Sequence, residues 1–404
     1  MFRVWYNSAK FSKPERPSLG ESLVGSQVGS GRSAKLILVE SPLLGADLEV
    51  ALLSLGALVE VRAPGDLGLD ALRASQARGT QALVSINHSP ELALLASLAG
   101  LRYVSWTIDP LPRERWSILG GTDLESIRLF VHRKALVGPL QAMGHLHAEW
   151  MPLACASRRW TDPVEGDRRT RPPLFVGSSL QDERRILTAG FERWGIADAI
   201  PAVDPMLLEL SRVCLWDRSF AGFSRDPASL PPSLLSVVPQ VDPLDLAEVL
   251  DAGLAWHFRR ELVGILFGRG VEIKGDDGWR DVAGDRWTGP LRNGREMTAA
   301  YAGAAVNLDV PRFHQREIAT LRAFDVLGSG GLLACEAGTE MDELFVPGEQ
   351  FLTWSNLSEL EGILDAVRRE DPVLDAIAKA GQDAVRQGHS MGDRGRRILE
   401  AASG

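Results

Sequence analysis

The feature that most constrains the fold is a regular alternation of short apolar runs and longer segments with helical spacing, which begins at residue 34. The apolar runs are AKLILVE, ALVEVRAP, ALVSINHSP and LRYVSWTIDP, and the segments between them are ADLEVALLSLG, GLDALRASQARG and ELALLASLAG. Continuous apolar runs are typical of strands that a parallel sheet buries on both faces. Strands that alternate with helices through short loops predict the α/β class. We therefore expect an N-terminal α/β domain over residues 34–156.

A second alternation follows a charged segment that has no periodicity. Residues 157–173, SRRWTDPVEGDRRTRPP, have the composition of a linker. The runs PLFVGSS, GVEIKGDDGW, AAVNLDV, GLLACEAG and QFLTWS then predict the strands of a second α/β domain over residues 174–371. A long, mostly helical region, residues 181–265, separates the first two of these strands, and the sequence does not indicate its role.

Both ends of the chain differ from the two predicted domains. Residues 1–33 are rich in Ser, Gly, Lys and Arg and predict a flexible tail without the continuous apolar core of a secretory signal. Residues 372–404 are predicted to be helical, and one arrangement is that these helices pack back on the N-terminal domain. The overall expectation is two Rossmann-like α/β domains with a helical C-terminal tail.

Length and composition limit the classes of function. The 404 residues suit two domains, and 45% hydrophobic with 24% charged residues is typical of a soluble globular protein. A net charge of −9 disfavours a general nucleic-acid-binding role. No apolar run approaches the roughly 18 residues that a membrane span needs, so we expect at most peripheral membrane contact.

The cysteines and histidines do not indicate a metal site or a disulfide framework. Cys155, Cys214 and Cys335 are far apart in sequence and form no CxxC pair, so a reducing cytoplasm is the expected location. His145 and His147 are two residues apart and would share one strand face, but no third ligand accompanies them. Nothing in the sequence indicates the oligomeric state.

The stretch TLRAFDVLGSGGLLACEAG, which begins at Thr320, contains a glycine-rich turn in the order helix, turn, strand. Glycine loops that bind nucleotides have the opposite order, with the strand before the helix. We therefore expect Gly328 to be a left-handed helix C-cap rather than part of a phosphate loop. Thr320 is a candidate N-cap, and the free N–H groups and the dipole at that end of the helix favour an anion.

Two carboxylates lie near the start of this helix. Glu317 precedes Thr320, and Asp325 lies within the helix. On one continuous helix, residues eight apart are about 80° out of alignment, so the pair faces a common cleft only if Glu317 lies on the loop. Carboxylates accept hydrogen bonds from sugar hydroxyls and the helix end suits a diphosphate, and together these indicate a nucleotide-sugar. The alternative is that both are ordinary solvated surface acids.

From about Ala304 to Leu364 the chain contains VNLDV, LRAFDVLGSGGLLACEAGTEMDELFVPGEQ and a later EL pair. These motifs resemble the C-terminal domain of group 1 glycosyltransferases, in particular the CgeB-like (spore-maturation type) branch. The segments PPLFVGSSLQDERR, VEIKGDDGW, YVSWTIDP and MPLA are similar to further motifs of that branch. Residues 181–265 match none of its motifs.

The resemblance implies a GT-B fold, in which two Rossmann-like domains face each other across a cleft and the donor nucleotide-sugar lies mainly on the C-terminal one. It implies an enzyme without a metal ion or other cofactor. By the same likeness Glu317 lies near the donor sugar and Asp325 accepts from the ribose hydroxyls, although related family-4 enzymes have Glu where this chain has Asp325. Family-4 likeness also implies retention of configuration at the anomeric carbon. We interpret Asp276 and Asp277 as turn residues rather than as a metal-binding pair.

Further candidates lie where predicted strands of the C-terminal domain end, because ligands of open parallel sheets bind there. Backbone N–H groups at Gly177 and Ser178 could reach a phosphate, or could belong to a plain turn. The guanidinium groups of Arg184 and Arg185 suit a diphosphate leaving group, as the resemblance also implies. The alternative is that they are solvated residues at a helix start.

Two more groups of residues complete the candidate donor site. Lys274 could neutralise the leaving phosphate, and the segment from Gly275 to Trp279 could pack on the nucleobase, unless it is a surface turn with an anchoring tryptophan. Thr320, Leu321 and Arg322 form the start of the donor helix. A cation such as Arg322 opposes the helix dipole there, which suggests a functional reason for it, such as holding a phosphate.

In the N-terminal domain, His88 and Asp109 both end predicted strands, where acceptor-side chemistry would occur. Asp109 could orient or deprotonate an acceptor hydroxyl, and His88 could contact the donor sugar. The alternatives are a turn-opening aspartate before proline and a structural histidine whose hydrogen bonds are satisfied.

Together these features predict a glycosyltransferase that moves a sugar from a nucleotide-sugar to a hydroxyl of a glycan, lipid-linked or protein acceptor. One alternative is a nucleotide-sugar epimerase on the same fold. Another is a GT-B-like binding protein without catalysis, for which Asp325 at the usual glutamate position and the unassigned helical region are the reasons. The sequence does not identify the sugar, the nucleotide or the acceptor.

Overall fold

The computed structural model describes residues 33–404 except 110, 112, 157, 159, 161–170, 221, 225–226, 233–234, 236–240, 285–286, 293, 314–315 and 370. The chain divides into two compact units: the first extends to Ser157 and also includes His389–Gly404, and the second is Arg158–Gly388. Most of the predicted linker, and the predicted N-terminal tail apart from Ser33, lie outside the described residues.

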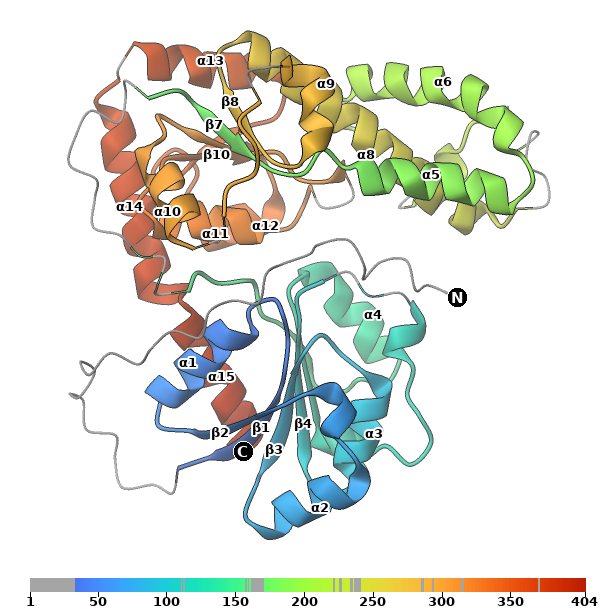
Figure 1. The fold of residues 1–404 in the computed structure, drawn as a ribbon, viewed down its shortest axis with the longest axis vertical. Coiled ribbons are helices and arrows are strands. Elements are labelled where there is room, and N and C mark those ends of the chain that lie inside the picture. The colour runs from blue at the N-terminus through green and yellow to red at the C-terminus, as the bar shows by residue number, and fades with distance from the viewer. Residues whose placement is uncertain are drawn as a thin grey trace. The chain divides into compact units, whose positions relative to one another are not determined.

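Within the described residues, the first unit contains a six-stranded parallel sheet in the order β2-β1-β3-β4-β5-β6 (Figure 1). Its core lies between the central strands and the helices. The apolar runs of β3 are buried throughout, as expected for a parallel sheet covered on both faces. The strands are β1 (Lys35–Val39), β2 (Leu58–Arg62), β3 (Ala82–Ile86), β4 (Arg102–Thr107), β5 (Ile127–Val131) and β6 (Ala148–Trp150), and the helices are α1 (Gly45–Ser54), α2 (Leu69–Ala77), α3 (Pro90–Leu98), α4 (Val137–Ala142) and α15 (Met391–Ser403).

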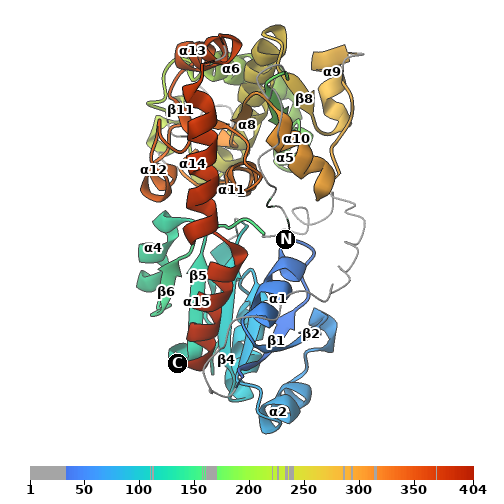
Figure 2. The same ribbon diagram turned by 90° about the vertical axis from the view of Figure 1, so that its left-hand side faces the viewer.

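Helix α15 completes the first unit although it follows the whole second unit in sequence. It packs against α1, and Figure 2 shows the two helices beside each other. A capping box formed by Ser390 and Asp393 starts the helix. The buried guanidinium of Arg394 donates to the carbonyl oxygens of Pro152 at 2.8 Å and Leu153 at 2.9 Å. These bonds fasten α15 to the segment that follows β6.

The second unit, in its described part, contains a five-stranded parallel sheet in the order β11-β10-β9-β7-β8. The two parallel sheets with their covering helices confirm the predicted α/β class. The strands are β7 (Leu174–Val176), β8 (Glu272–Lys274), β9 (Asn307–Asp309), β10 (Leu333–Glu336) and β11 (Leu352–Trp354), and the helices are α5 (Gln181–Arg193), α6 (Ile200–Val213), α8 (Pro243–Gly268), α9 (Arg280–Ala283), α10 (Arg295–Gly303), α11 (Leu321–Gly328), α12 (Thr339–Leu344), α13 (Leu357–Arg368) and α14 (Val373–Gly388).

The helical region between β7 and β8 consists mainly of α5, α6 and α8, which pack side by side (Figure 1). Two glycines allow this close packing. A methyl group at Gly190 of α5 would lie 2.9 Å from Val249, and one at Gly253 of α8 would lie 2.8 Å from Leu187. Helix α8 has 26 residues, and most of its central residues are buried beneath the other two helices and the sheet.

The end of α11 corrects one prediction. Gly328 is the last helical residue rather than a left-handed cap, and Gly330 has the left-handed φ of 75°. The N–H of Gly330 bonds to the Leu327 carbonyl at 2.9 Å, and the N–H of Gly331 bonds to the Val326 carbonyl at 3.0 Å. This is a Schellman motif, which places the left-handed residue two positions after the last helical one. The turn nevertheless leads into strand β10, as predicted.

Candidate functional site

The strand order of the second unit creates a topological switch point between β7 and β9. The chain begins this sheet with β7, adds β8 on one side of it, and then adds β9 on the other side. Ligands of open parallel sheets bind beyond the carboxyl ends of the strands at such a point. Gly177 and Ser178 follow β7 there, and Asp309 is the last residue of β9. These residues define the centre of the candidate site.

Asp309 connects the end of β9 to the start of α11. Its buried carboxylate accepts a hydrogen bond from Thr320 Oγ1 and pairs with the guanidinium of Arg322. Thr320 is the N-cap of α11, as predicted, because its Oγ1 accepts from the N–H of Ala323 at 3.3 Å. Burial opposes the charge of Arg322, but Asp309 and Tyr301 raise its pKa above the ordinary value. Arg322 therefore keeps its positive charge. It lies in the first turn of α11, whose first helical residue is Leu321.

The guanidinium of Arg322 also reaches the end of β7. A methyl group at Gly177 would lie 3.1 Å from Arg322 Nη2 and 2.7 Å from the ring of Phe175. Arg322 Cζ lies 5.7 Å from the centroid of that ring, which is within the range of a cation–π interaction. The structure thus brings three predicted donor-site residues, Gly177, Thr320 and Arg322, to one place at the switch point.

Asp276 fixes the backbone at the ends of β7 and β8. Its carboxylate accepts from the N–H and the hydroxyl of Ser179, at 2.9 Å and 2.5 Å, and from the N–H of Gly278 at 3.1 Å. This is the turn role predicted for Asp276. A methyl group at Gly275 would lie 2.0 Å from the carbonyl oxygen of Gly177, so the approach of the two strand ends requires glycine there.

Trp279 and Lys274 have partners within the fold. Trp279 is fully buried and donates from Nε1 to the Gly177 carbonyl at 2.8 Å, which is the anchoring alternative rather than a free ring for a nucleobase. Lys274 Nζ lies 2.9 Å from Glu272 Oε1 and donates to Thr288 Oγ1. Both side chains therefore help to shape the turn after β8.

Arg184 and Arg185 pair with carboxylates of the helical region. Arg184 forms a two-pronged ion pair with Asp204 of α6, and its guanidinium lies 5.1 Å from the centroid of the Trp256 ring. Arg185 pairs with Asp182 one turn earlier on α5 and is exposed. A diphosphate would have to compete with these carboxylates for both arginines. Their role in donor binding stays a prediction.

Glu317 lies on the loop before α11 and Asp325 lies on the helix, which is the placement that a shared cleft requires. Asp325 is buried. The loop is fixed by Glu340, whose N–H donates to the Glu317 carbonyl at 3.3 Å and whose Oε2 accepts from the N–H of Ala319 at 3.3 Å. The contacts of Glu317 with a sugar and of Asp325 with a ribose stay predictions.

In the first unit, Asn87 joins the carboxyl ends of β3 and β4. Its Nδ2 donates to Asp109 Oδ2 at 2.8 Å, and its Oδ1 accepts from the N–H groups of Ile108 at 2.9 Å and Asp109 at 3.1 Å. Asn87 has a left-handed φ of 65°, which asparagine tolerates better than most residues. Asn87 thus orients the carboxylate of Asp109, the predicted acceptor-side residue.

His88 is buried in a cluster of rings at the same end of the sheet. Its imidazole stacks on Trp116 with centroids 5.6 Å apart, and the rings of His145 and Tyr103 lie at 5.5 Å and 5.7 Å. Burial first, and then the charges of His145 and Arg115, lower the pKa of His88 to about 3. The ring is 3% exposed, so its predicted contact with a donor sugar would require it to leave this cluster.

Three organising side chains were not among the predicted residues: Asp309, Asn87 and Arg259. Asp309 and Asn87 are polar residues at the ends of the apolar runs VNLD and ALVSIN, which is a signal that could have identified them. Arg259 lies in the apolar helix α8, where a buried charge is the corresponding signal. Its two partners are the carbonyl oxygens of Ser178 and Val310, which are remote in sequence.

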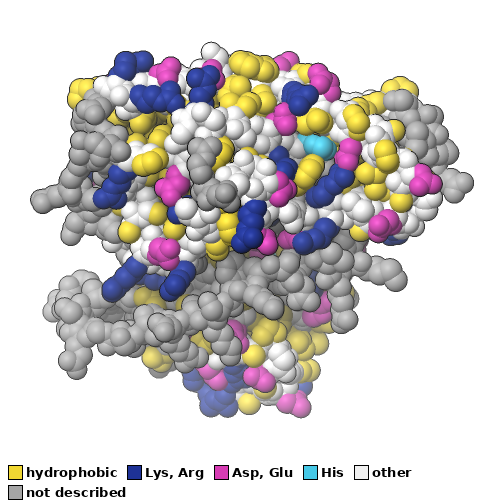
Figure 3. Space-filling view, turned by 45° about the horizontal axis from the view of Figure 1, so that its top comes forward, with side chains coloured by type: hydrophobic (Ala, Val, Ile, Leu, Met, Phe, Trp, Pro, Cys, Tyr) yellow, Lys and Arg dark blue, Asp and Glu magenta, His cyan; other side chains and the backbone are white. Residues whose placement is uncertain are grey.

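Some features bear on metals, membranes and surface charge. Among the residues that the structure describes, no three or more His, Cys, Asp or Glu side chains form a group that could hold a metal ion. None of the described helices is both long enough and apolar enough to cross a membrane. On the face shown in Figure 3, Lys and Arg side chains are interspersed with Asp and Glu rather than gathered in one basic patch.

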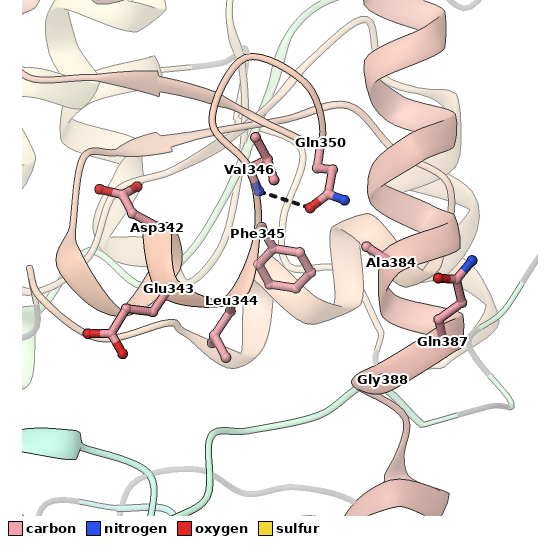
Figure 4. A pocket seen from close by; sticks show the side chains of 9 residues that line it. All are labelled: Asp342, Glu343, Leu344, Phe345, Val346, Gln350, Ala384, Gln387 and Gly388. Atoms are coloured by element: carbon pink, nitrogen blue, oxygen red, sulfur yellow. Dashed lines mark hydrogen bonds between the residues drawn. The ribbon is translucent and has the colours of Figure 1, made fainter.

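A shallow pocket of about 350 Å³ lies between α12 and the end of α14. Figure 4 shows Phe345 at its centre, Asp342 and Glu343 on the α12 side and Gln387 on the α14 side. The N–H of Val346 donates to Gln350 Oε1 at 2.9 Å across its rim. None of the predicted site residues lines this pocket.

A family model and several solved structures are similar to this chain. Residues 256–400 match a family described as "Glycosyl transferase-like". A glycosyltransferase from Rickettsia africae is similar at 11% identity and a TM-score of 0.52, over 92% of this chain and 98% of that one. Comparison with curated proteins gives no match.

Two further solved structures are similar at lower TM-scores. Sucrose-phosphate synthase from Thermosynechococcus elongatus has 13% identity and a TM-score of 0.47, over 92% of this chain and all of that one. Anabaena Alr3699/HepE in complex with UDP has 12% identity and a TM-score of 0.46, over 92% of this chain and 99% of that one. The fold assignment depends on the two parallel sheets and on the Rickettsia africae enzyme: the chain has the GT-B fold of glycosyltransferases.

Proposed function

We propose that this protein is a glycosyltransferase that moves a sugar from a nucleotide-sugar to an acceptor hydroxyl. The observation that carries the proposal is the cation Arg322, paired with Asp309 in the first turn of α11 and adjacent to Gly177 at the switch point. Helix starts and arginine side chains both favour phosphate groups. The match of residues 256–400 to a glycosyl transferase-like family supports the same reaction class.

In the proposed reaction, the bond between the anomeric carbon and the diphosphate oxygen breaks, and the acceptor oxygen bonds to that carbon. The diphosphate leaves with the bonding electrons, and the acceptor hydroxyl loses its proton. Arg322 and the N–H groups at the start of α11 would stabilise the negative charge that develops on the diphosphate. Because arginine supplies this positive charge, we propose that the transfer needs no metal ion.

The other predicted residues have proposed roles in the same reaction. Asp325 would accept from the ribose hydroxyls, and Glu317 would contact the donor sugar. For retention at the anomeric carbon, the acceptor oxygen would attack on the face from which the diphosphate departs, and the departing phosphate oxygen would take the acceptor proton. Asp109 would orient the acceptor hydroxyl, because Asn87 holds its carboxylate in one orientation.

A titration with nucleotides tests the donor part of this proposal. We expect UDP, GDP, dTDP or CMP to bind the wild type in isothermal titration and to raise its melting temperature. The double variant Asp309→Asn with Arg322→Met removes the ion pair without leaving a buried charge, and should weaken that binding by about tenfold or more. Arg292→Met, which removes an exposed arginine from the same unit, is the control and should bind as the wild type does. No binding of any of the four nucleotides by the wild type would refute the proposal.

Product analysis separates the proposal from its alternatives. The bound nucleotide-sugar is incubated with a panel of glycan, lipid-linked and protein acceptors, and without acceptor. Transfer to an acceptor supports the glycosyltransferase. A new nucleotide-sugar formed without acceptor would favour an epimerase, and binding without turnover across the panel would favour a binding protein.

A further inference from the structure

Arg259 lies behind the switch point and joins the two strand ends that form it. It belongs to α8, and only 3% of its surface is exposed. Its Nη1 donates to the carbonyl oxygen of Ser178 at 3.3 Å, just after β7. Its Nη2 donates to the carbonyl oxygen of Val310 at 2.6 Å, just after β9. A charged side chain from the helical region therefore links the two strand ends beyond which a donor diphosphate is proposed to bind.

The charge of Arg259 has carbonyl oxygens rather than a carboxylate as its hydrogen-bond partners. The acids near it, Glu183 and Asp309, pair with Arg312 at 2.7 Å and with Arg322, respectively. Among the described residues, the buried Nε of Arg259 has no hydrogen-bond partner. Burial first, and then the positive charges of Arg322 and Arg312, lower the pKa of Arg259 to about 9. The cluster of three arginines thus holds more positive charge than its two paired acids compensate.

We propose that Arg259 is a positioning residue for donor binding, which supplies from behind the strand ends a positive charge that the donor diphosphate neutralises. This inference rests on the proposed function. A buried charge without a counterion is costly, and a dianion bound beyond the ends of β7 and β9 removes that cost. Because Coulomb interactions inside a protein extend over several ångströms, Arg259 contributes to affinity without touching the ligand.

The charge and the hydrogen bonds of Arg259 can be separated by two substitutions. Arg259→Gln keeps a donor for a carbonyl oxygen but removes the charge, and Arg259→Lys keeps the charge but loses the two-pronged geometry. Arg269→Gln is the matched control, because Arg269 directly follows α8 and is half-exposed beside Glu361. The ligands are UDP, GDP and dTDP, each compared with its own nucleoside, which carries the same base and ribose but no phosphate.

We expect Arg259→Gln to weaken the binding of the nucleoside diphosphate by about tenfold or more, and the binding of the nucleoside by less than about twofold. Arg259→Lys should stay within about threefold of the wild type, and Arg269→Gln should equal it. Equal affinity of the diphosphate for Arg259→Gln and the wild type would overturn the inference. An equal loss of affinity for the diphosphate and for the nucleoside would also overturn it, because that result would show that Arg259 only maintains the structure of the site.

Further outcomes separate failure of this inference from failure of the proposed function. If Arg259→Gln does not fold, Arg259→Lys still decides: a tenfold loss of diphosphate affinity at an unchanged melting temperature would contradict a role that depends on charge. If the wild type binds none of the nucleoside diphosphates, the proposed function fails and this inference fails with it. Binding by the wild type with no effect at Arg259 leaves the function in place and refutes the inference alone.

Discussion

Replacement of His88 by phenylalanine should make the first unit less sensitive to acid. The imidazole of His88 is stacked on Trp116 inside the ring cluster, so a phenylalanine ring can occupy the same place. Burial lowers the pKa of His88 from 6.5 to about 3 in the folded protein. As the pH falls, the imidazole therefore takes up a proton in the unfolded chain at a higher pH than in the folded protein. The contribution of His88 to the free energy of unfolding is fully present above about pH 6.5 and is lost as the pH falls towards 3.

The size of this effect follows from the two pKa values. For one group with a pKa of 6.5 unfolded and about 3 folded, the free energy of unfolding falls by about 2 kcal/mol between about pH 8 and about pH 5. A variant without the imidazole lacks that contribution. Between about pH 8 and about pH 5, the free energy of unfolding of His88→Phe should therefore fall by about 2 kcal/mol less than that of the wild type. This difference is independent of any loss of packing energy that the variant shows at about pH 8.

Native-state hydrogen exchange gives the assay, because it reports opening of one unit separately from the other. The free energy of opening is measured for peptides that cover β3 and β4, at about pH 8 and about pH 5, in the wild type and in His88→Phe. The same measurement on peptides of β9 and β10 in the second unit is the internal control and should not distinguish the two proteins. Equal losses of stability in the β3 and β4 peptides of both proteins would refute the view that His88 is held neutral by burial.

Three further predictions concern the second unit and the docking of α15. Asp309→Asn should weaken binding of the donor nucleotide and lower the free energy of unfolding by about 3 kcal/mol, because it leaves a buried arginine without its carboxylate; calorimetry measures both, and an unchanged nucleotide affinity would contradict the site. Gly278→Ala should lower the free energy of unfolding, measured by chemical denaturation, by about 1–3 kcal/mol, because its methyl group would lie 2.1 Å from the buried hydroxyl oxygen of Ser179. Gly264→Ala is the control: the nearest atom to its methyl group is 3.9 Å away, so this variant should be as stable as the wild type or more stable. Arg394→Met removes two hydrogen bonds from α15 to carbonyl oxygens, so it should speed hydrogen exchange in the first unit by about tenfold. An equal change in the second unit would show that these bonds do not act on the first unit alone.

The fold could be predicted because its signals are local. Most strands of the two sheets lie in short, mainly apolar runs that alternate with helical segments, so the α/β class follows from periodicity. Thr320 was identifiable as an N-cap for the same reason, since its hydroxyl serves an N–H three residues later. The left-handed residue after α11 was assigned two positions too early, to Gly328 instead of Gly330, because the sequence does not show which residue is the last helical one.

The partners of the site residues could not be predicted in the same way. Arg184 is an ordinary basic residue in the sequence, and Asp204 becomes its partner only because α5 and α6 pack against α8. The buried position of His88 depends on Trp116, which lies 28 residues later in the chain. Spacing along the chain therefore indicates where a charged group lies, but the counterions that decide its chemistry come from tertiary contacts.

The return of α15 to the first unit has a consequence for biosynthesis. Contacts between α1 and α15 link residues that are more than three hundred positions apart, so they close only after the entire second unit has been made. During translation the first unit lacks the helix that covers α1 until the second unit has been synthesised. Because such incomplete units expose apolar surface, we expect the nascent first unit to be the stage at which this chain is most prone to aggregation and most dependent on chaperones.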